Sequence, residues 1–279
     1  MVDAKTEPVD LSVSLVVFRP DIEQLNKTLE SLRRSIVSAG VVMGRRFSAE
    51  LFLVDNGGLP ALRDVRDKYE ACGISWNDIG QHGNVGFGRG HNLALDRICG
   101  RYHLVLNPDV EFDGESIAHA IKFLDSHSSV GLFSPRITGA DGGVQYLCRR
   151  YPSVVDLFLR GFIPVQFRRF FAKRLAHYEM RDVINDHDIV WDPPIVSGCF
   201  MLFRTDVLKK LGGFDPRYFL YFEDYDLSLR THDVARVAYV PSVRVIHHGG
   251  GASRKGFAHI RMFAASAFKF YNRFGWRLW

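Results

Sequence analysis

The stretch ELFLVDNGG, residues 50–58, sets the fold class of this chain. A short apolar run ends abruptly at Asp55 and a turn of Asn and two glycines, as a strand buried on both faces does when it meets a turn. The same succession of apolar run and polar turn recurs at 11–18 and 102–106, and segments with helical periodicity lie between these runs. Alternating strands and helices predict an α/β fold with a mostly parallel central sheet flanked by helices.

The spacing of the apolar residues also places the individual elements. Strands are expected at 11–18, 50–54, 74–76, 102–106, 130–133, 195–203, 235–240 and 243–246. Helices are expected at 21–38, 59–72, 89–98, 116–126, 206–211, 223–232 and 256–279, and also within 151–178. Asp21 stands where the first helix needs its N-terminal cap.

The composition limits the class of protein. A chain of 279 residues with 47% hydrophobic residues can bury the core of one large α/β domain. Its net charge of +5 suits anionic partners such as phosphates or lipid head groups. This charge is too weak to indicate nucleic-acid binding, so we expect no nucleic-acid partner.

The cysteines and the N-terminal residues bear on the compartment. The four cysteines, at 72, 99, 148 and 199, form no C-x-x-C pair, which argues against a zinc ribbon and favours small buried residues in a reducing compartment. The first ten residues lack the basic start and apolar run of a signal peptide. No apolar run approaches the ~18 residues of a membrane-spanning helix. We therefore expect a cytoplasmic protein.

Two acidic residues follow predicted strands. Asp55 and Asp109 lie just past strand ends, where parallel sheets bind their ligands. The Asp55 carboxylate can accept the N3–H of a uracil or thymine ring; the alternative is a plain Asx turn. In Asn107-Pro108-Asp109 the carboxylate can hold Mg²⁺ or Mn²⁺ against a departing diphosphate; the alternative is a capped proline turn.

The segment NVGFGRGHN, residues 84–92, is a glycine-rich loop that enters a helix. Glycines let a backbone approach a ligand closely, and the start of a helix favours anionic groups. His91 stands where the dinucleotide-binding fingerprint needs its third glycine, and no Walker lysine follows. A purely structural turn remains an equal alternative.

Two further clusters carry groups capable of chemistry. Tyr221-Phe222-Glu223-Asp224-Tyr225-Asp226 places three acids at a helix start, where the helix dipole alone can favour them. Their aromatic neighbours favour a partly desolvated pocket in which one carboxylate acts as a general base. His247 and His248, followed by glycines, can complete a metal site or touch phosphate; a structural role is the alternative.

Taken in order, these motifs resemble glycosyltransferase family 2. The match is closest to the rhamnosyltransferase-type branch that builds bacterial surface polysaccharides such as O-antigen, and it runs from about residue 11 to 253. Its motifs are VDNG at 54–57, NVGFG at 84–88, LNPD at 106–109, VSGC at 196–199, GGFD at 212–215, FEDYDL at 222–227 and HHGG at 247–250.

The resemblance implies a GT-A fold, an inverting mechanism and a divalent metal, Mg²⁺ or Mn²⁺. Asp224 matches the family's catalytic base, and Glu223 is its neighbour. Asp109 matches the last acid of the metal-binding D-x-D motif, and His247 or His248 matches the histidine that approaches the metal. The donor-binding positions implied are Asp55, Asn84, Gly86, Gly88, Asn92 and Asn107, of which Asn107 replaces the first acid of D-x-D and His91 stands where relatives often carry Asn.

The resemblance also implies the organisation and the partners. A GT-A domain over 1–253 would comprise a Rossmann-like nucleotide-binding half at about 11–135 and an acceptor-binding half at about 136–253. The donor would be a dTDP- or UDP-sugar, with rhamnose as one candidate sugar, and the acceptor a glycan or lipid-linked glycan. The basic aromatic helix at 254–279 would lie on the inner face of the cell membrane, or else pack on the core or form a homodimer.

Two other functions compete with this hypothesis. A sugar nucleotidyltransferase would carry a glycine-rich loop after the first strand, where Phe18-Arg19-Pro20-Asp21 offers no glycine. A non-catalytic nucleotide-sugar or carbohydrate-binding protein has no need of the intact pair Glu223-Asp224.

Overall fold

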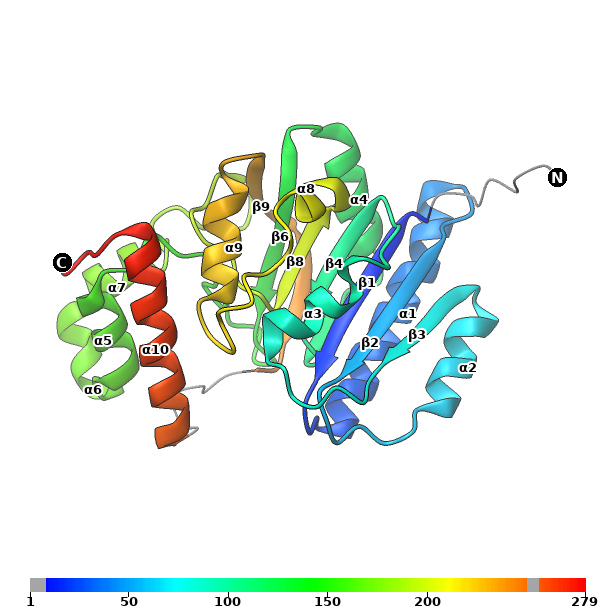
Figure 1. The fold of residues 1–279 in the computed structure, drawn as a ribbon. Coiled ribbons are helices and arrows are strands. Elements are labelled where there is room, and N and C mark those ends of the chain that lie inside the picture. Colours follow the sequence, from blue (N-terminus) through cyan, green and yellow to red (C-terminus); the bar gives the residue numbers. More distant parts are fainter. Residues whose placement is uncertain (1–8, 250–255) are drawn as a thin grey trace.

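The computed structural model describes residues 9–249 and 256–279. Within these residues, nine strands form one sheet in the order β3-β2-β1-β4-β8-β6-β9-β5, and β7 pairs with β9. Helices α3, α8 and α9 cover one face of the sheet, and α1 and α4 cover the other (Figure 1). The predicted boundary at 253/254 lies outside the described residues, as does Gly250 of the last motif.

The first four strands in the sequence pair in parallel, as predicted. They lie side by side in the order β3, β2, β1, β4. Their bounds are Leu11–Val17 for β1, Ala49–Asp55 for β2, Ile74–Ile79 for β3 and Tyr102–Leu106 for β4. The connecting helices are α1 at Ile22–Met43, α2 at Arg63–Ala71 and α3 at Phe87–Leu95. The Asp21 carboxylate accepts from the backbone N–H of Gln24, which confirms the predicted cap.

The second half of the chain makes the sheet mixed. Strand β8 (Phe200–Arg204) runs antiparallel to both β4 and β6 (Val130–Thr138). Strand β6 is parallel to β9 (Arg236–His247), while β5 (Val110–Phe112) and β7 (Val190–Trp191) are antiparallel to β9. The strand predicted at 195–203 is therefore shorter than expected, because residues 195–199 make a bridge and a turn before β8 begins.

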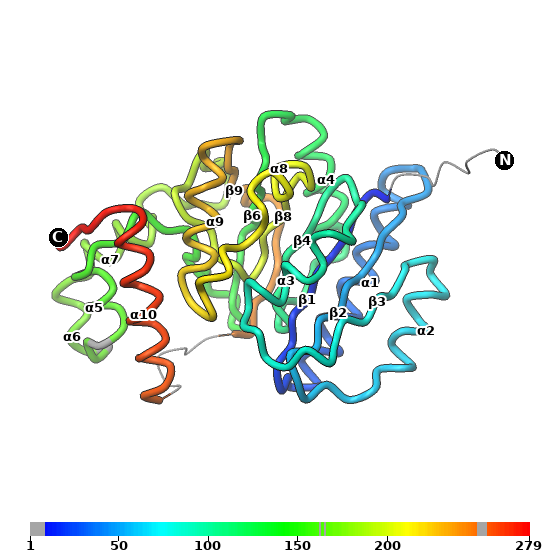
Figure 2. The backbone as a smooth tube through the Cα atoms, viewed as in Figure 1, coloured from blue at the N-terminus to red at the C-terminus, as the bar shows by residue number. Residues whose placement is uncertain are grey.

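The remaining helices cover the sheet and extend beyond it. Their bounds are α4 Ser116–Ser126, α5 Val154–Phe162, α6 Val165–Arg168, η1 (3₁₀) Arg169–Phe171, α7 Ala172–Tyr178, α8 Thr205–Lys210, α9 Glu223–Thr231 and α10 Phe257–Phe274. Helices α5, α6, α7 and α10 lie together at one end of the molecule, beyond α9 (Figure 2). They form a separate helical layer that contributes no strand.

One face of α10 packs into the core, as the core-packing alternative predicted. Phe270 and Tyr271 are buried in a cluster with Tyr178, Tyr218 and Phe222. The opposite face leaves Phe257 and Phe268 81% and 59% exposed. Arg254 and Lys255, which we expected to extend this basic surface, lie outside the described residues.

The cysteines correct one expectation. Cys148 and Cys199 are buried as predicted, but Cys72 and Cys99 are exposed at the surface. Cys72 accepts a contact from the Arg33 guanidinium, and Cys99 lies against the Glu50 carboxylate, so both have polar surroundings rather than apolar ones. Among the described residues, no helix is long and apolar enough to cross a membrane.

Candidate active site

Asp55 lines a cavity at the carboxyl ends of β2 and β3. The cavity measures about 330 Å³, and Trp76, Asp78 and Arg66 also line it. One Asp55 oxygen accepts from the Gly57 N–H at 2.7 Å, which is the predicted Asx turn. A carboxylate has a second oxygen with its own lone pairs, so the turn leaves acceptor capacity toward the cavity.

The glycine-rich loop is held closely between the sheet and a later segment. Gly86 has φ +90°, and a Cβ there would lie 2.2 Å from the Phe219 carbonyl oxygen. The Gly86 N–H donates to the Asn84 side chain, and the Asn56 amide donates to the Gly86 carbonyl, both at 3.0 Å. Gly88 packs against Phe214, where a Cβ would come within 2.8 Å. Both glycines are therefore required by close packing inside the protein.

Asn92 and His91 face the protein interior. The Asn92 carboxamide accepts from the Phe214 N–H at 2.9 Å and donates to the Phe214 carbonyl at 2.7 Å. His91 is buried, with Nδ1 2.7 Å from the Ser14 hydroxyl, and burial lowers the pKa of this imidazole well below its usual range. Asn92 thus fixes the Gly-Gly-Phe-Asp segment onto α3.

The structure brings Asp109 and His247 together. The His247 Nε2 lies 3.4 Å from the Asp109 Oδ1, and that buried oxygen has no hydrogen-bond partner among the described residues. A Cβ on Gly249 would lie 2.5 Å from each of the two groups, so the chain passes directly over them. His248 points elsewhere, with its Nε2 3.0 Å from Glu111. The geometry therefore identifies His247, and not His248, as the histidine beside Asp109, a choice that the sequence left open.

This pair fits a divalent cation held by few protein ligands. A buried, unpartnered carboxylate oxygen beside an imidazole nitrogen supplies two suitable donors. Across the described residues, no group of three or more His, Cys, Asp and Glu gathers to hold a metal. Any cation here would need further oxygens from a ligand such as a diphosphate.

A turn at 197–199 joins this pair to the acids of α9. The Asn107 N–H donates to the Cys199 carbonyl at 3.0 Å, which fixes the end of β4 to the turn. The Gly198 N–H donates to the Asp224 Oδ2 at 2.9 Å. The charges of Asp109 and Asp224 both raise the pKa of the Cys199 thiol, after burial, which raises it most. The strand-end site and the α9 carboxylates therefore lie on either side of one short turn.

At the start of α9, Glu223 is buried and Asp224 is partly buried. Burial, and then the neighbouring Asp224, raise the pKa of Glu223 to about 8, and the Glu223 Oε2 has no hydrogen-bond partner within the described chain. Burial also raises the pKa of Asp224, although each of its oxygens accepts one backbone N–H. Tyr221 and Phe222, directly before them, have φ of +70° and +65°. Such left-handed backbone at bulky residues stores strain of the kind found at functional sites.

These carboxylates open onto the larger cavity, of about 650 Å³. Its lining combines the two acids with Ser197, several aromatic rings from before and within α9 and from α10, and three arginines, Arg149, Arg160 and Arg168. A backbone bridge joins Arg149 to Ile195, which lies close to the 197–199 turn in the sequence. Sequence analysis missed the arginines, because no spacing along the chain connects them to α9.

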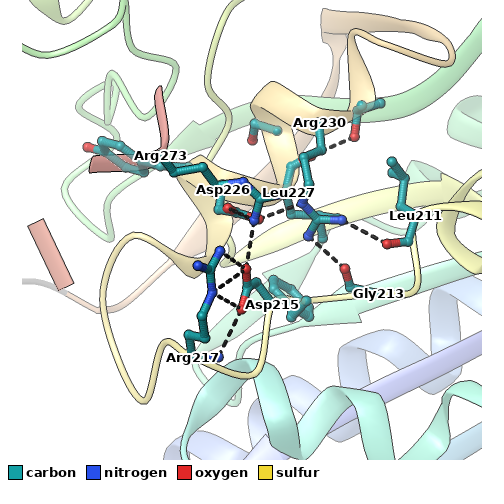
Figure 3. Close-up of polar contacts among 12 residues, drawn as sticks. Leu211, Gly213, Asp215, Arg217, Asp226, Leu227, Arg230 and Arg273 are labelled. Carbon is teal, nitrogen blue, oxygen red and sulfur yellow. Dashed lines mark hydrogen bonds and ion pairs between the residues drawn. The ribbon is translucent and has the colours of Figure 1, made fainter. Parts of the chain in front are cut away.

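Asp226, the third acid of the motif, has a different role. Its carboxylate is fully buried between Arg230 of α9, at 2.6 Å, and Arg273 of α10, at 2.7 Å (Figure 3). Arg273 also contacts Asp215, at 2.6 Å. Arg230 donates in addition to the carbonyls of Leu211 and Gly213. Asp226 therefore ties α10 and the Gly-Gly-Phe-Asp segment to the helix that carries the two pocket acids.

Comparison with known proteins extends this description. The sequence profile of the family described as glycosyl transferase family 2 matches residues 13–212, a range that ends before Glu223. N-acetylglucosaminyl-diphospho-decaprenol L-rhamnosyltransferase of Mycobacterium tuberculosis is 31% identical over 149 residues, which are 52% of this chain and 46% of that protein. The chain thus spans about half the length of this relative. Rhamnosyltransferase WbbL of Escherichia coli K12 is 26% identical over 204 residues, 68% of this chain and 72% of that protein.

Solved structures show the same fold at low identity. TarS of S. aureus in complex with UDP has a TM-score of 0.57 at 16% identity, covering 95% of this chain and 66% of that one. The mannosyltransferase PcManGT of Pyrobaculum calidifontis, in complex with GDP-Man and Mn²⁺, has a TM-score of 0.58 at 16% identity, covering 95% and 67%.

Proposed function

Because the chain belongs to glycosyl transferase family 2 and has the GT-A fold, we propose that it transfers a sugar from a dTDP- or UDP-sugar donor to a glycan or lipid-linked glycan acceptor in polysaccharide synthesis. Both relatives are named as rhamnosyltransferases, which favours rhamnose as the sugar. One observation carries the proposal. The Asp109–His247 pair and the two pocket acids of α9, Glu223 and Asp224, lie on either side of the 197–199 turn, as a leaving-group site and a base site need to.

Asp224 is the proposed base. It removes the proton from the acceptor hydroxyl while the hydroxyl oxygen attacks the anomeric carbon and the bond from that carbon to the diphosphate oxygen breaks. The proton ends on Asp224, the diphosphate leaves with the bonding electrons, and the configuration inverts. The raised pKa of Asp224 supports this role, because a more basic carboxylate takes a proton more readily. Glu223, with its pKa at about 8, stays protonated near neutral pH and is suited to donate a hydrogen bond.

Asp109 and His247 would hold the divalent cation, Mg²⁺ or Mn²⁺. When bound, the cation supplies neutralising charge to the departing diphosphate. The unpartnered Asp109 oxygen and its 3.4 Å approach to His247 support this assignment. His248, paired with Glu111, is left outside the cation site.

The nucleotide would lie over the carboxyl ends of β2 and β4. At the smaller cavity, the Asp55 carboxylate would accept a hydrogen bond from N3–H of the base. Trp76 also lines this cavity and would offer an aromatic ring for the base to stack on, which supports this placement. The loop from Asn84 to Gly88 and the polar Asn107 would face the diphosphate. Asn92 would act indirectly, because its carboxamide is occupied by the Phe214 backbone.

Exposed aromatic and basic residues support a peripheral position at the inner face of the cell membrane, in the cytoplasm. Phe257 and Trp279 are 81% and 83% exposed, and Arg261 and Arg277 lie on or after the same helix. Such surfaces bind anionic lipid. Flotation with phosphatidylglycerol vesicles tests this, and dimerisation through the same face, the competing role, would appear as a doubled mass by light scattering without vesicle binding.

Transfer is tested with dTDP-rhamnose, other dTDP- and UDP-sugars, and short-chain lipid-linked glycans, with and without Mn²⁺. We expect nucleoside diphosphate release that depends on acceptor and falls ~10²–10⁴-fold in Asp224→Asn. Asp233→Asn, an exposed acid at the far end of the same segment, is the matched control and should keep full activity. Release of pyrophosphate from a nucleoside triphosphate and a sugar 1-phosphate, with formation of the sugar nucleotide, would instead favour the nucleotidyltransferase function. Absence of turnover with every donor, while nucleotides still bind, would favour the non-catalytic one.

A further inference from the structure

Three arginines share the larger cavity with the two pocket acids. Arg149 precedes the helical layer, Arg160 lies on α5, and Arg168 ends α6. Arg149 is only 4% exposed, so its guanidinium belongs to the cavity wall rather than to the surface. The cavity therefore has a basic wall as well as the acidic one formed at the start of α9.

The basic wall is under-neutralised by the protein. The Arg149 guanidinium donates to the Cys148 carbonyl at 3.0 Å and lies 5.7 Å from the centre of the Tyr178 ring. Within residues 9–249 and 256–279, neither Arg149 nor Arg168 is in an ion pair with a carboxylate. Arg160 pairs with Glu179, at 3.5 Å, and that carboxylate pairs more closely with Arg181, at 2.6 Å. The charge of Asp224 also acts on Arg149 and Arg160 within the same cavity, so one carboxylate there faces several guanidinium groups.

A buried guanidinium with no carboxylate in direct contact is unfavourable, because its desolvation is only partly compensated. The lowest-cost partner for several guanidinium groups in one cavity is an anion with many oxygens, and arginine forks match phosphate oxygens in pairs. In the proposed function, the nucleotide's own diphosphate binds elsewhere, on the Asp109 side of the 197–199 turn. The three arginines are therefore suited to bind a second phosphate-bearing ligand.

We propose that Arg149, Arg160 and Arg168 form a subsite for the phosphate or diphosphate of a lipid-linked acceptor. This inference rests on the proposed function, and it assigns the residues that hold the phosphate of the lipid-linked acceptor. With the phosphate on the basic wall, the sugar attached to it spans toward Asp224, where its hydroxyl is deprotonated.

The rim of the cavity fits the lipid part of such an acceptor. Ile260 and Phe263 of α10 line it, and Ile260 is 42% exposed. Outside the lining, Phe167 and Phe170 flank Arg168 in the sequence and are 50% and 70% exposed. An apolar rim around a basic subsite matches a prenyl chain that continues from a phosphate ester, whereas a free sugar or an inorganic phosphate would gain nothing from it.

Binding without turnover tests the subsite. Farnesyl diphosphate, inorganic pyrophosphate and farnesol are titrated by calorimetry into the full chain and into Arg168→Gln. The matched control is Arg169→Gln, the next residue, which is exposed and does not line the cavity. We expect farnesyl diphosphate to bind the protein and the control equally and to bind Arg168→Gln about tenfold or more weakly, since one charge-assisted contact is lost. Farnesol affinity, and dTDP affinity with Mn²⁺, should be the same in all three proteins.

The other outcomes overturn the inference in distinct ways. Equal binding by the two variants removes Arg168 from the site. Displacement of farnesyl diphosphate by dTDP or UDP would mean that farnesyl diphosphate occupies the donor site. Equal affinities for pyrophosphate and farnesyl diphosphate would mean that the prenyl chain contributes nothing to binding. Arg149→Lys keeps the charge and should weaken binding while its melting temperature stays near that of the unaltered chain. Because none of these measurements needs transfer, a failed transfer assay leaves them independent of the proposed function.

Discussion

Gln145 holds His247 at both ends. The Gln145 Nε2 donates to the His247 backbone carbonyl at 2.8 Å, and the Gln145 Oε1 lies 2.8 Å from the imidazole Nδ1. Because the NH₂ end is used on the carbonyl, the oxygen faces Nδ1, which must carry the proton. The Nε2 lone pair is then directed to Asp109, at 3.4 Å. A residue outside the predicted site thus selects the tautomer that can bind a cation.

Gln145→Leu should therefore weaken Mn²⁺ binding by ~10–100-fold, the range found when a partner of a metal-binding histidine is removed. The free Mn²⁺ signal in electron paramagnetic resonance gives the affinity without any need for turnover. Gln145→Glu keeps an acceptor for the Nδ1 proton and should retain more affinity than Leu. Unchanged Mn²⁺ affinity in the Leu variant would show that the tautomer is fixed in some other way.

The pKa of Glu223 predicts a specific pH dependence of stability. In the unfolded chain this group has its ordinary value of 4.5, and in the folded protein burial raises it to about 8. A raised pKa contributes stability that is fully present below the unfolded value and is lost as the pH rises through the folded one. Glu223→Gln cannot ionise, so it should become the more stable protein, relative to the unaltered chain, as the pH rises from 5 to 9.

Melting temperatures of the two proteins across this range provide the measurement. Groups such as His103, whose pKa burial lowers to about 3, titrate alike in both and cancel in the difference. A difference that stays flat between pH 5 and 9 would mean that Glu223 is not desolvated in the folded protein.

Arg273 should matter for stability far more than its surface position suggests. Arg273→Ala leaves the fully buried Asp226 with only one of its two guanidinium partners. We expect a loss of about 3 kcal/mol in the free energy of unfolding, the lower end for breaking a buried ion pair. Arg261→Ala, an exposed position on the same helix, should change it by less than ~0.5 kcal/mol. Urea denaturation compares them, and equal losses would contradict the role of the network in Figure 3.

Two glycines of the same loop separate strain from steric exclusion. Gly83 and Gly86 both have positive φ, of +70° and +90°, but a Cβ at Gly83 meets nothing within 4 Å. Gly83→Ala should cost only ~1 kcal/mol of backbone strain. Gly86→Ala must also displace the Phe219 carbonyl and with it the hydrogen bond from the Phe87 N–H. We expect calorimetry to show loss of donor-nucleotide affinity in Gly86→Ala but not in Gly83→Ala. Equal affinities of the two variants would show that the position of this loop does not affect donor binding.

Local patterns predicted the elements whose signals are local. The strand at 102–106 and the helix at 116–126 have the predicted bounds, because an apolar run and a helical periodicity each end at a clear break. The sequence predicts two strands, at 235–240 and 243–246, where the structure has the single strand β9. Pro241 interrupts the apolar pattern at the point where the pairing with β6 shifts register. Strand β5 is three residues long, too short for any period to be visible.

The site was predictable only where a motif marks it. Asp109 and Asp224 carry local signals, but their approach through the 197–199 turn depends on β8 inserting beside β4. Gln145 and Arg149 have no signal of their own, since each acts on a partner about 75 or more residues away. The resemblance to a family identified the motif residues and was silent on these two.

The pairing of β4 with β8 has a mechanical consequence. Five consecutive residue pairs, from Tyr102–Arg204 to Leu106–Phe200, join the half that carries Asp55 and Asp109 to the half that carries the α9 acids. Because the two halves share one continuous sheet, they cannot open and close by a hinge motion between domains. Entry and exit of substrates must therefore be a matter of side chains and overlying helices moving on a rigid floor, with the distance from leaving group to base preset before either substrate arrives.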